Sequence, residues 1–347
     1  MRVLVAMSGG VDSSVAAARL VGAGHDVTGA TLRLWGGESD TGCCSAADVD
    51  DARRVADGLG IDHHTFAYGE EFAAGVIDPY VAAHAAGATP NPCVACNRTV
   101  KFGALLERAD RLGFDAVATG HHARVIVGSD GVRRLRRGAD GAKDQSYVLA
   151  GLDHDRLGRV LFPVGDSTKT GVRTEAAALG LRTAAKAESQ DVCFIARADD
   201  GRRRFLGRRL SLTPGRVVDT DGRAVGSVAA VETVTVGQRR GLGLPGGTAP
   251  RYALSVDIAA TTVVVGTREE LNADALPVTE PGWAAGPTED ELVWQTSAHG
   301  QPRPGRFGER SDGGLAVTWS EPERRAAPGQ LVVGYRDDAV VAWATAC

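Results

Sequence analysis

The sequence predicts an α/β protein: an N-terminal parallel sheet covered by helices, followed by β-rich domains. Two observations carry this prediction. Apolar strands alternate with helices from Arg2 to Thr119, and beyond residue 199 short β-type runs separated by Gly, Asp and Pro replace that alternation. Alternating strands and helices are typical of a parallel sheet with helices on both faces, whereas regular short strands with turn signals are typical of a barrel.

The length and composition bound the class of protein. A chain of 347 residues is long for one hydrophobic core. We place an α/β domain at 1–198, a small central β-rich domain at 199–267 and a C-terminal β-barrel at 268–347. Hydrophobic content of 43% and charged content of 24% are ordinary for a soluble globular protein. Without a signal pattern or a membrane-length apolar run, we expect a cytoplasmic protein with no membrane partner.

The elements of the first domain follow from its apolar runs. Strands are expected at 3–6, 27–34, 61–66 and 115–119, and helices at 15–21, 46–59, 70–86, 99–112 and 169–179. Residues 89–97 contain two prolines and are expected to form an irregular loop. Because ligands bind beyond the carboxyl ends of parallel strands, Ser8, the residues after Leu34 and the Gly120–His121 turn should lie along one rim.

The second half of the chain is expected to be built from strands. The β-type runs of the central domain are 217–218, 231–236, 252–258 and 261–265. Those of the C-terminal domain are 291–296, 315–319, 331–335 and 339–345.

The turn at residues 7–14, Met-Ser-Gly-Gly-Val-Asp-Ser-Ser, joins the first strand to the first helix. Two glycines let successive amide N–H groups turn toward one point, and the start of a helix favours an anion. The turn therefore predicts a phosphate or pyrophosphate site. It lacks the Lys and the spacing of a Walker loop and is not G-x-G-x-x-G. It resembles the SGGxDS PP-loop of the ATP pyrophosphatases, which grip the pyrophosphate of ATP and activate a carbonyl-type oxygen as an adenylate.

The charge of the chain gives evidence both for and against nucleic-acid binding. A net charge of −4 argues against a generally basic nucleic-acid binder, although a sum over the chain can hide a basic face. Clusters of basic residues in a sequence are most often solvated surface. Three groups of arginines stand out: Arg133, Arg134, Arg136 and Arg137 just before Lys143; Arg202, Arg203, Arg204, Arg208 and Arg209; and Arg239 with Arg240.

The cysteines suggest metal or redox chemistry in a chain of this size. They are Cys43, Cys44, Cys93, Cys96, Cys193 and Cys347. Cys93 and Cys96 form a C-x-x-C pair, but structural zinc needs four ligands, and adjacent Cys43 and Cys44 would chelate one tetrahedral ion poorly. We expect no metal centre here. A zinc-containing tRNA-binding protein, a thioredoxin-type pair and buried inert thiols remain alternatives.

An ordered set of motifs gives a specific resemblance. After the PP-loop come T-P-N-P-x-x-x-C-N, T-G-H, K-D-Q-S-Y, C-F-I, G-Q-R-x-G-L and a late P-G-Q. Over nearly the whole chain this order resembles the tRNA-specific 2-thiouridylases of the MnmA type, whose first domain is a PP-loop (adenine nucleotide alpha hydrolase-like) domain. The resemblance implies ATP-dependent 2-thiolation of the wobble uridine of tRNA through an adenylated uridine and a cysteine persulfide.

The same resemblance implies partners and cofactors. They are tRNA, ATP, a persulfide sulfur donor or sulfur-relay protein, and a thiol reductant. Mg²⁺ is expected with ATP because the pyrophosphate charge needs a metal partner beyond the amides of the loop, and Asp12 is the nearest carboxylate. Another PP-loop enzyme that adenylates a small molecule remains an alternative, although it would have no use for Cys96, Cys193 or two appended β domains.

The resemblance also implies the site residues. Cys193 would carry the persulfide and Cys96 would be its partner nucleophile. ATP would be bound by Ala6, Met7, Ser8, Gly9, Gly10, Val11, Asp12, Ser13, Leu32 and Gly120. The target base would face Asn91, Pro92 and Cys93, and the tRNA would contact His121, Lys143, Asp144, Gln145, His299 and Gln330.

Two departures from the family pattern affect these roles. Some members carry an Asp, thought to act in proton transfer, where Cys93 stands. The late Arg-Tyr segment of the family appears here as Ser-Ala-His-Gly at 297–300.

Overall fold

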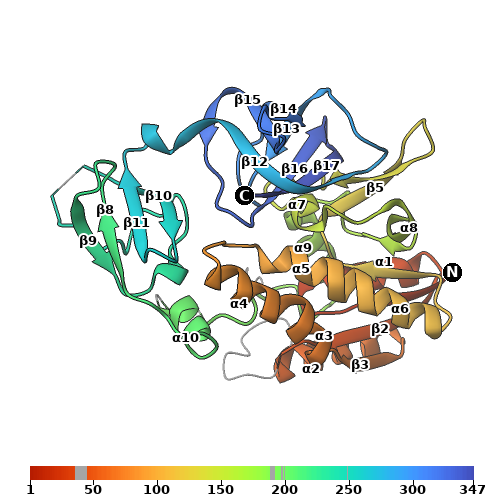
Figure 1. Cartoon of the computed structure of the whole chain (residues 1–347). Helices are drawn as coiled ribbons and strands as arrows, with labels where there is room; N and C mark the ends of the chain where they lie inside the picture. The colour runs from red at the N-terminus through yellow and green to blue at the C-terminus, as the bar shows by residue number, and fades with distance from the viewer. Residues whose placement is uncertain (36–44, 188–191, 197, 199, 248) are drawn as a thin grey trace. The chain divides into compact units, whose positions relative to one another are not determined.

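The computed structural model describes residues 1–35, 45–187, 192–196, 198, 200–247 and 249–347 (Figure 1). Cys43 and Cys44 lie outside the described residues. The described part divides into two compact units. The first unit comprises Met1–Val76, Pro92–Ala196 and Asp338–Val341, and the second comprises Ile77–Asn91, Arg197–Asp337 and Ala342–Cys347. Because both units are discontinuous in sequence, the boundaries of the three predicted domains stay a prediction.

The first unit is built on a parallel sheet in the order β3-β2-β1-β4-β7. Its strands are β1 (Arg2–Ala6), β2 (Asp26–Arg33), β3 (His63–Ala67), β4 (Ala116–Thr119) and β7 (Val160–Leu161). Each pairing is parallel. Val3, Leu4 and Val5 are fully buried, as a continuous apolar run in a covered parallel sheet should be. The predicted α/β architecture is confirmed.

Helices α1 (Val11–Gly22) and α2 (Ala46–Leu59) pack against this sheet, and α9 (Lys169–Ala178) packs against α1. One apolar cluster joins β1 to α1 and α2, and another joins α1 to α9 through Val11, Val15, Val172 and Ala176. The predicted span of α2 is confirmed, because Ser45 caps its first turn and Gly60, at φ 70°, ends it.

The prediction of an irregular loop at residues 89–97 is wrong over most of that range. Pro92 begins the short helix α5 (Pro92–Cys96), which runs through the π-helical turn η2 (Asn97–Ala104) into α6 (Leu105–Arg111). A proline needs no N–H partner in the first turn of a helix, so Pro92 starts this helix where the prediction expected a break. The predicted helix at 70–86 is likewise divided into α3 (Gly69–Phe72), the π-helical turn η1 (Ala73–Ile77) and α4 (Asp78–Ala85).

The rest of the first unit contains elements that the sequence prediction missed. An antiparallel hairpin joins β5 (Ala123–Val127) to β6 (Arg133–Arg137), and β6 carries the first arginine group. Ala339 at the start of β17 pairs with Arg136. The short helices α7 (Ser146–Leu149) and α8 (His154–Leu157) follow the hairpin.

The central sheet of the second unit has the order β10-β11-β8-β9. Helix α10 (Gly201–Gly207) precedes its strands, which are β8 (Gly215–Val218), β9 (Ala224–Val228), β10 (Tyr252–Asp257) and β11 (Thr262–Gly266). The strand predicted at 231–236 is wrong: residues Val231–Thr233 form the 3₁₀ turn η3, and Val231 and Val234 enter the apolar cluster of this sheet. A short apolar run shows burial without fixing the element type.

The C-terminal strands form a closed antiparallel barrel, as predicted. They follow the 3₁₀ turn η4 (Glu269–Leu271) in the order β12-β15-β14-β13-β16-β17, and a pairing of β12 with β17 closes the ring. Their bounds are β12 (Asn272–Trp283), β13 (Glu291–Gln295), β14 (Arg303–Glu309), β15 (Leu315–Arg324), β16 (Leu331–Arg336) and β17 (Ala339–Ala346). Prolines and glycines in β12 and β14 hid both strands from the sequence prediction.

Among the described residues, no helix combines the length and apolar character needed to cross a membrane.

Candidate active site

The PP-loop joins the end of β1 to the start of α1. Gly9 has φ 69°, and a Cβ built on it would lie 2.2 Å from the backbone oxygen of Asp48. Gly10 is the N-cap of α1, and its carbonyl accepts hydrogen bonds from the hydroxyls of Ser13 (3.1 Å) and Ser14 (2.8 Å). Gly9 is therefore required by its backbone angle and by its closeness to Asp48, whereas Gly10 has an ordinary extended backbone, with φ −94° and ψ 165°.

Gly120 brings the end of β4 against this turn. A Cβ at Gly120 would lie 2.5 Å from the backbone nitrogen of Ser13 and 2.6 Å from the carbonyl carbon of Asp12. On the other side, the Met7 amide donates to Ala30 of β2 at 2.8 Å, and buried Leu32 lies two residues further along that strand. The predicted ATP residues thus gather at adjacent strand ends, where ligands of parallel sheets bind.

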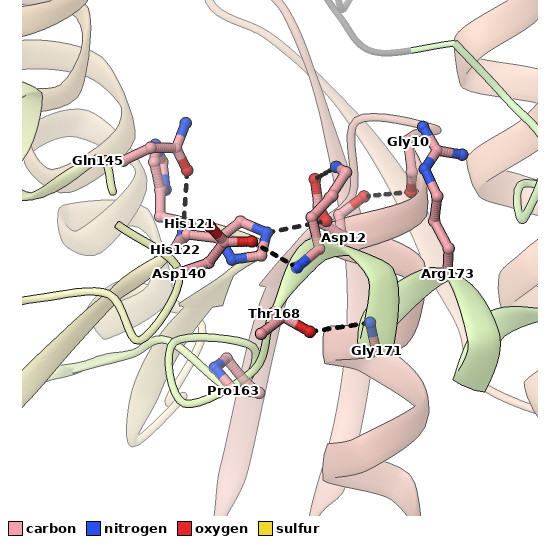
Figure 2. A network of polar contacts seen from close by, with 12 residues as sticks. Gly10, Asp12, His121, His122, Asp140, Gln145, Pro163, Thr168, Gly171 and Arg173 are labelled. Atoms are coloured by element: carbon pink, nitrogen blue, oxygen red, sulfur yellow. Dashed lines mark hydrogen bonds and ion pairs between the residues drawn. The ribbon is translucent and has the colours of Figure 1, made fainter. Parts of the chain in front are cut away.

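Asp12 is the charged centre of the turn (Figure 2). Its carboxylate accepts hydrogen bonds from Nε2 of His122 at 3.1 Å and from Nζ of Lys169 at 2.6 Å. Burial alone would raise the pKa of Asp12, but the hydrogen bonds and charges of His122 and Lys169 outweigh it and hold that pKa below its ordinary value. Asp12 is therefore ionised at neutral pH.

Sequence reasoning found neither partner of Asp12. His122 directly follows the predicted His121, and Lys169 follows Thr168, whose hydroxyl caps α9 by accepting from the amide of Gly171. A Thr before a helical pattern is a readable start signal. The sequence separation of 157 residues between Lys169 and Asp12 hid the contact itself.

Residues 138–145, here called the Asp140 loop, contain three of the predicted tRNA contacts: Lys143, Asp144 and Gln145. Gln145 accepts from the backbone N–H of His122 at 2.9 Å, and Asp140 accepts from the backbone N–H of Lys169 at 2.9 Å (Figure 2). The loop is therefore hydrogen-bonded to both partners of Asp12.

Asp144 is turned inward. Its carboxylate accepts from Arg137 at 2.8 Å, from the Gly138 amide at 3.0 Å, and from the amide and hydroxyl of Ser146 at 3.0 and 2.9 Å. Its side chain is 6% exposed. The geometry gives Asp144 a part in shaping the loop, and its contact with tRNA stays a prediction.

His121 is also buried. Its Nδ1 lies 2.7 Å from the hydroxyl of Thr119, and its ring packs against Phe102 and Phe162 with centroid distances of 5.8 and 6.1 Å. These contacts anchor the turn after β4, and the tRNA contact of His121 remains a prediction.

The candidate cysteines lie on two segments of the first unit. Cys93 is half-buried and Cys96 is buried, both on α5, and the next residue, Asn97, donates to the carbonyl of Val148 at 3.0 Å. Cys193 is half-buried beside Phe194, which packs against Phe72 (5.8 Å between centroids) and Trp35 (6.4 Å). Within the described residues, no group of three or more His, Cys, Asp or Glu side chains is placed to hold a metal ion.

Three further predicted tRNA residues, Asn91, His299 and Gln330, lie in the second unit. The side-chain amide of Gln330 donates to the carbonyl of Thr89, two residues before half-buried Asn91. His299 is exposed in the turn after β13, which Gln295 supports by donating to Ser297 (2.8 Å) and Ala298 (3.0 Å). Their roles stay predictions, as does that of Pro92 at the start of α5.

Comparisons with known proteins give a consistent family. A family model described as the tRNA methyl transferase HUP domain matches residues 1–197, and one described as the tRNA methyl transferase PRC-barrel domain matches 203–267. The chain is 47% identical to the tRNA-specific 2-thiouridylase MnmA of Chloroflexus aurantiacus, over 98% of this chain and 96% of that one. Proteins of the same name from Salinispora arenicola (49% identical, 97% and 95% covered) and Cutibacterium acnes (48% identical, 100% and 96% covered) match equally well.

Proposed function

This chain belongs to the tRNA-specific 2-thiouridylase family, and we propose that it uses ATP to replace the C2 oxygen of the wobble uridine of tRNA with sulfur. The observation that carries the proposal is the occurrence, within one compact unit, of a pyrophosphate-type turn and two separate cysteine segments. The relatives that match over nearly the full chain bear the name of this activity.

The word methyl transferase in the family-model descriptions suggests a different chemistry, which the residues favour less. The commonest donor of a biological methyl group is an adenosyl sulfonium without phosphate, which would make no use of an amide cradle at a helix start. The turn at Gly9 and Gly10 suits a pyrophosphate, and methyl transfer would need neither Cys96 nor Cys193.

The residues of the turn suit Mg-ATP. Mg²⁺ usually keeps several waters and is held by one or two carboxylates together with substrate phosphates. Asp12 is a carboxylate of this kind, ionised and placed at the start of α1. When bound, the ion would neutralise charge on the phosphates, while the amides of the PP-loop orient the pyrophosphate end of ATP.

In the first half-reaction the C2 oxygen of uridine attacks the α-phosphorus of ATP and pyrophosphate leaves. The residues of the turn bind and orient the leaving group, and Gly120 lets the end of β4 approach the start of α1 closely. The product is a uridine adenylate with AMP as a leaving group at C2.

In the second half-reaction the terminal sulfur of a persulfide on Cys193 attacks C2, and AMP leaves. The thiolate of Cys96 then attacks Sγ of Cys193. That attack breaks the sulfur–sulfur bond, releases 2-thiouridine and leaves a Cys96–Cys193 disulfide. A thiol reductant reopens the disulfide, and a persulfide donor or relay protein, acting in the cytoplasm, reloads Cys193.

The test is to incubate the protein with tRNA, Mg-ATP and a persulfide source, digest the RNA and search for 2-thiouridine by mass. Cys193→Ser should release pyrophosphate but form no 2-thiouridine, and Cys96→Ser should accept sulfur on Cys193 without releasing product. Cys347→Ser, which changes an exposed cysteine of the barrel, is the matched control and should behave as wild type.

Peptide mapping after a single turnover without reductant gives a second test. A Cys96–Cys193 disulfide is expected. A Cys93–Cys96 disulfide with Cys193 still a thiol would overturn the assignment of the two roles.

A further inference from the structure

Lys169 lies at the PP-loop although it comes from a distant part of the chain. It is the first residue of α9, and its ammonium is 2.6 Å from the carboxylate of Asp12. The side chain of Lys169 is 12% exposed and that of Asp12 is 26% exposed. The cation is therefore held in a partly desolvated place directly beside the start of α1.

The negative charge of the PP-loop makes a cation at this position important for binding ATP. Asp12 is the single charged residue of the sequence from Ala6 to Ser14, and it is negative. The polyphosphate of ATP is also negative, so the amides and the helix start would bind it against the repulsion of Asp12. A cation from elsewhere in the fold removes that difficulty, as the lysine within the loop does in Walker-type sites.

A purely structural role explains the Lys169–Asp12 pair less well. Helices α1 and α9 are already joined by the apolar cluster of Val11, Val15, Val172 and Ala176, and by the pair of Arg19 with Glu175 at 2.5 Å. Desolvation of a partly buried ion pair offsets much of its attraction, so the pair is weak evidence of stabilisation.

The anchoring of Lys169 leaves its ammonium able to change partner. The backbone N–H of Lys169 donates to Asp140, and Thr168 caps the helix, so the main chain is fixed. The four-carbon stem of a lysine is flexible and carries a compact point charge. A rotation of the side chain is enough to move the ammonium from Asp12 to a phosphate oxygen.

We propose that Lys169 is an ATP-binding residue that pairs with Asp12 before ATP binds and contacts the pyrophosphate end of ATP afterwards. The proposal rests on the proposed use of ATP. In the bound state Lys169 neutralises charge on the pyrophosphate as it leaves, and Asp12 faces the Mg²⁺ that accompanies ATP. His122 keeps its hydrogen bond to Asp12 and holds the carboxylate in place.

The experiment measures the Kd of Mg-ATP by equilibrium binding to the full chain, without tRNA or sulfur donor. Lys169→Met should raise the Kd about 10–100-fold, the range that the loss of one charge-assisted hydrogen bond gives. Lys169→Arg should restore most of the affinity. Glu175→Gln removes the charge from the other ion pair between α1 and α9 and should bind ATP as wild type does.

Two results would overturn the proposal: an unchanged Kd for Lys169→Met, or an equal loss of ATP affinity in Glu175→Gln. Thermal unfolding of each variant without ATP shows whether the fold is kept, and Lys169→Arg preserves the test if the Met variant unfolds. Failure of the proposed function would look different, because wild type would bind ATP, Lys169→Met would bind it weakly, and yet no 2-thiouridine would form.

Discussion

At the scale of single residues, the nucleotide site depends on two glycines, because a side chain at either position would collide with the neighbouring backbone. Gly9 needs a positive φ and faces the backbone of Asp48, whereas Gly120 has no special backbone angle and is required because β4 approaches α1 so closely. Sequence reasoning could explain the first glycine by its turn, but the second depends on a tertiary contact that no local pattern encodes.

Gly120→Ala should therefore lower ATP affinity more than tenfold and cost about 1–3 kcal/mol of stability, because the new methyl group overlaps the start of α1. The measurements are ATP titration and denaturant unfolding. Gly58→Ala is the matched control: it lies in α2 with nothing within 4 Å of the added Cβ, and it should raise stability by about 0.5–1 kcal/mol. Wild-type ATP affinity in Gly120→Ala would contradict the geometry of this site.

His84 gives the second unit a dependence on pH. Its Nδ1 lies 2.8 Å from the carbonyl of Glu232, and its buried Nε2 has no hydrogen-bond partner in the described structure. Burial, opposed by the Glu232 hydrogen bond and reinforced by the charge of Arg202, holds the pKa of His84 below 6.5. Below pH 6.5 the unfolded chain binds a proton that the folded chain does not. The stability from neutral His84 is thus fully present above pH 6.5 and is lost as pH falls toward the lowered pKa.

We expect the melting temperature of the wild type to fall between about pH 7.5 and about pH 5.5. His84→Asn keeps a donor near the position of Nδ1 and removes Nε2, so its melting temperature should depend less on pH in this window. The variant starts from lower stability, since a cavity replaces part of the ring. An equally steep decline in the variant would show that another group causes the effect.

At the scale of elements, the sequence predicted best where local signals and burial agree. Helix α2 was placed correctly because a Ser cap and a left-handed Gly bound an amphipathic run. Helix α5 was missed because the prolines suggested a loop, although Pro92 occupies the one part of a helix that accepts it. The PP-loop could be read as a nucleotide site because its chemistry is contiguous, whereas Lys169 and His122 reach Asp12 through the tertiary fold.

The segment at 192–196 forms neither a helix nor a strand, and a buried side chain holds it in place. Phe194 is 1% exposed and anchors the segment against Phe72 and Trp35. Phe194→Ala should leave pyrophosphate release near the wild-type rate but lower 2-thiouridine formation about 10–100-fold, because a small misplacement of Cys193 is costly for sulfur transfer. The two half-reactions, measured on the same sample, serve as each other's control. Equal losses in both would mean that Phe194 supports the whole unit and does not position Cys193.

At the scale of the whole molecule, a chain of net charge −4 must present local positive surface to bind tRNA. Three of the four arginines of the first group are paired with carboxylates: Arg134 with Asp130, Arg136 with Asp338, which also pairs with Arg124, and Arg137 with Asp144. On α10, Arg203 and Arg204 share one carboxylate, that of Asp200, at 3.7 and 3.2 Å, and their side chains are 53% and 61% exposed. A net positive charge therefore remains on α10.

The salt dependence of tRNA binding should separate these two groups. Each phosphate neutralised by an arginine releases counterions and adds about 1 to the slope of log affinity against log salt. We expect the double variant Arg203→Gln with Arg204→Gln to lower that slope by about 1–2 and to melt as wild type does. Arg134→Gln with Arg136→Gln should instead lower the melting temperature and keep the slope, because these arginines are paired within the protein. The reverse result, with the slope falling only in the β6 variant, would place the tRNA backbone on β6 and remove α10 from the interface.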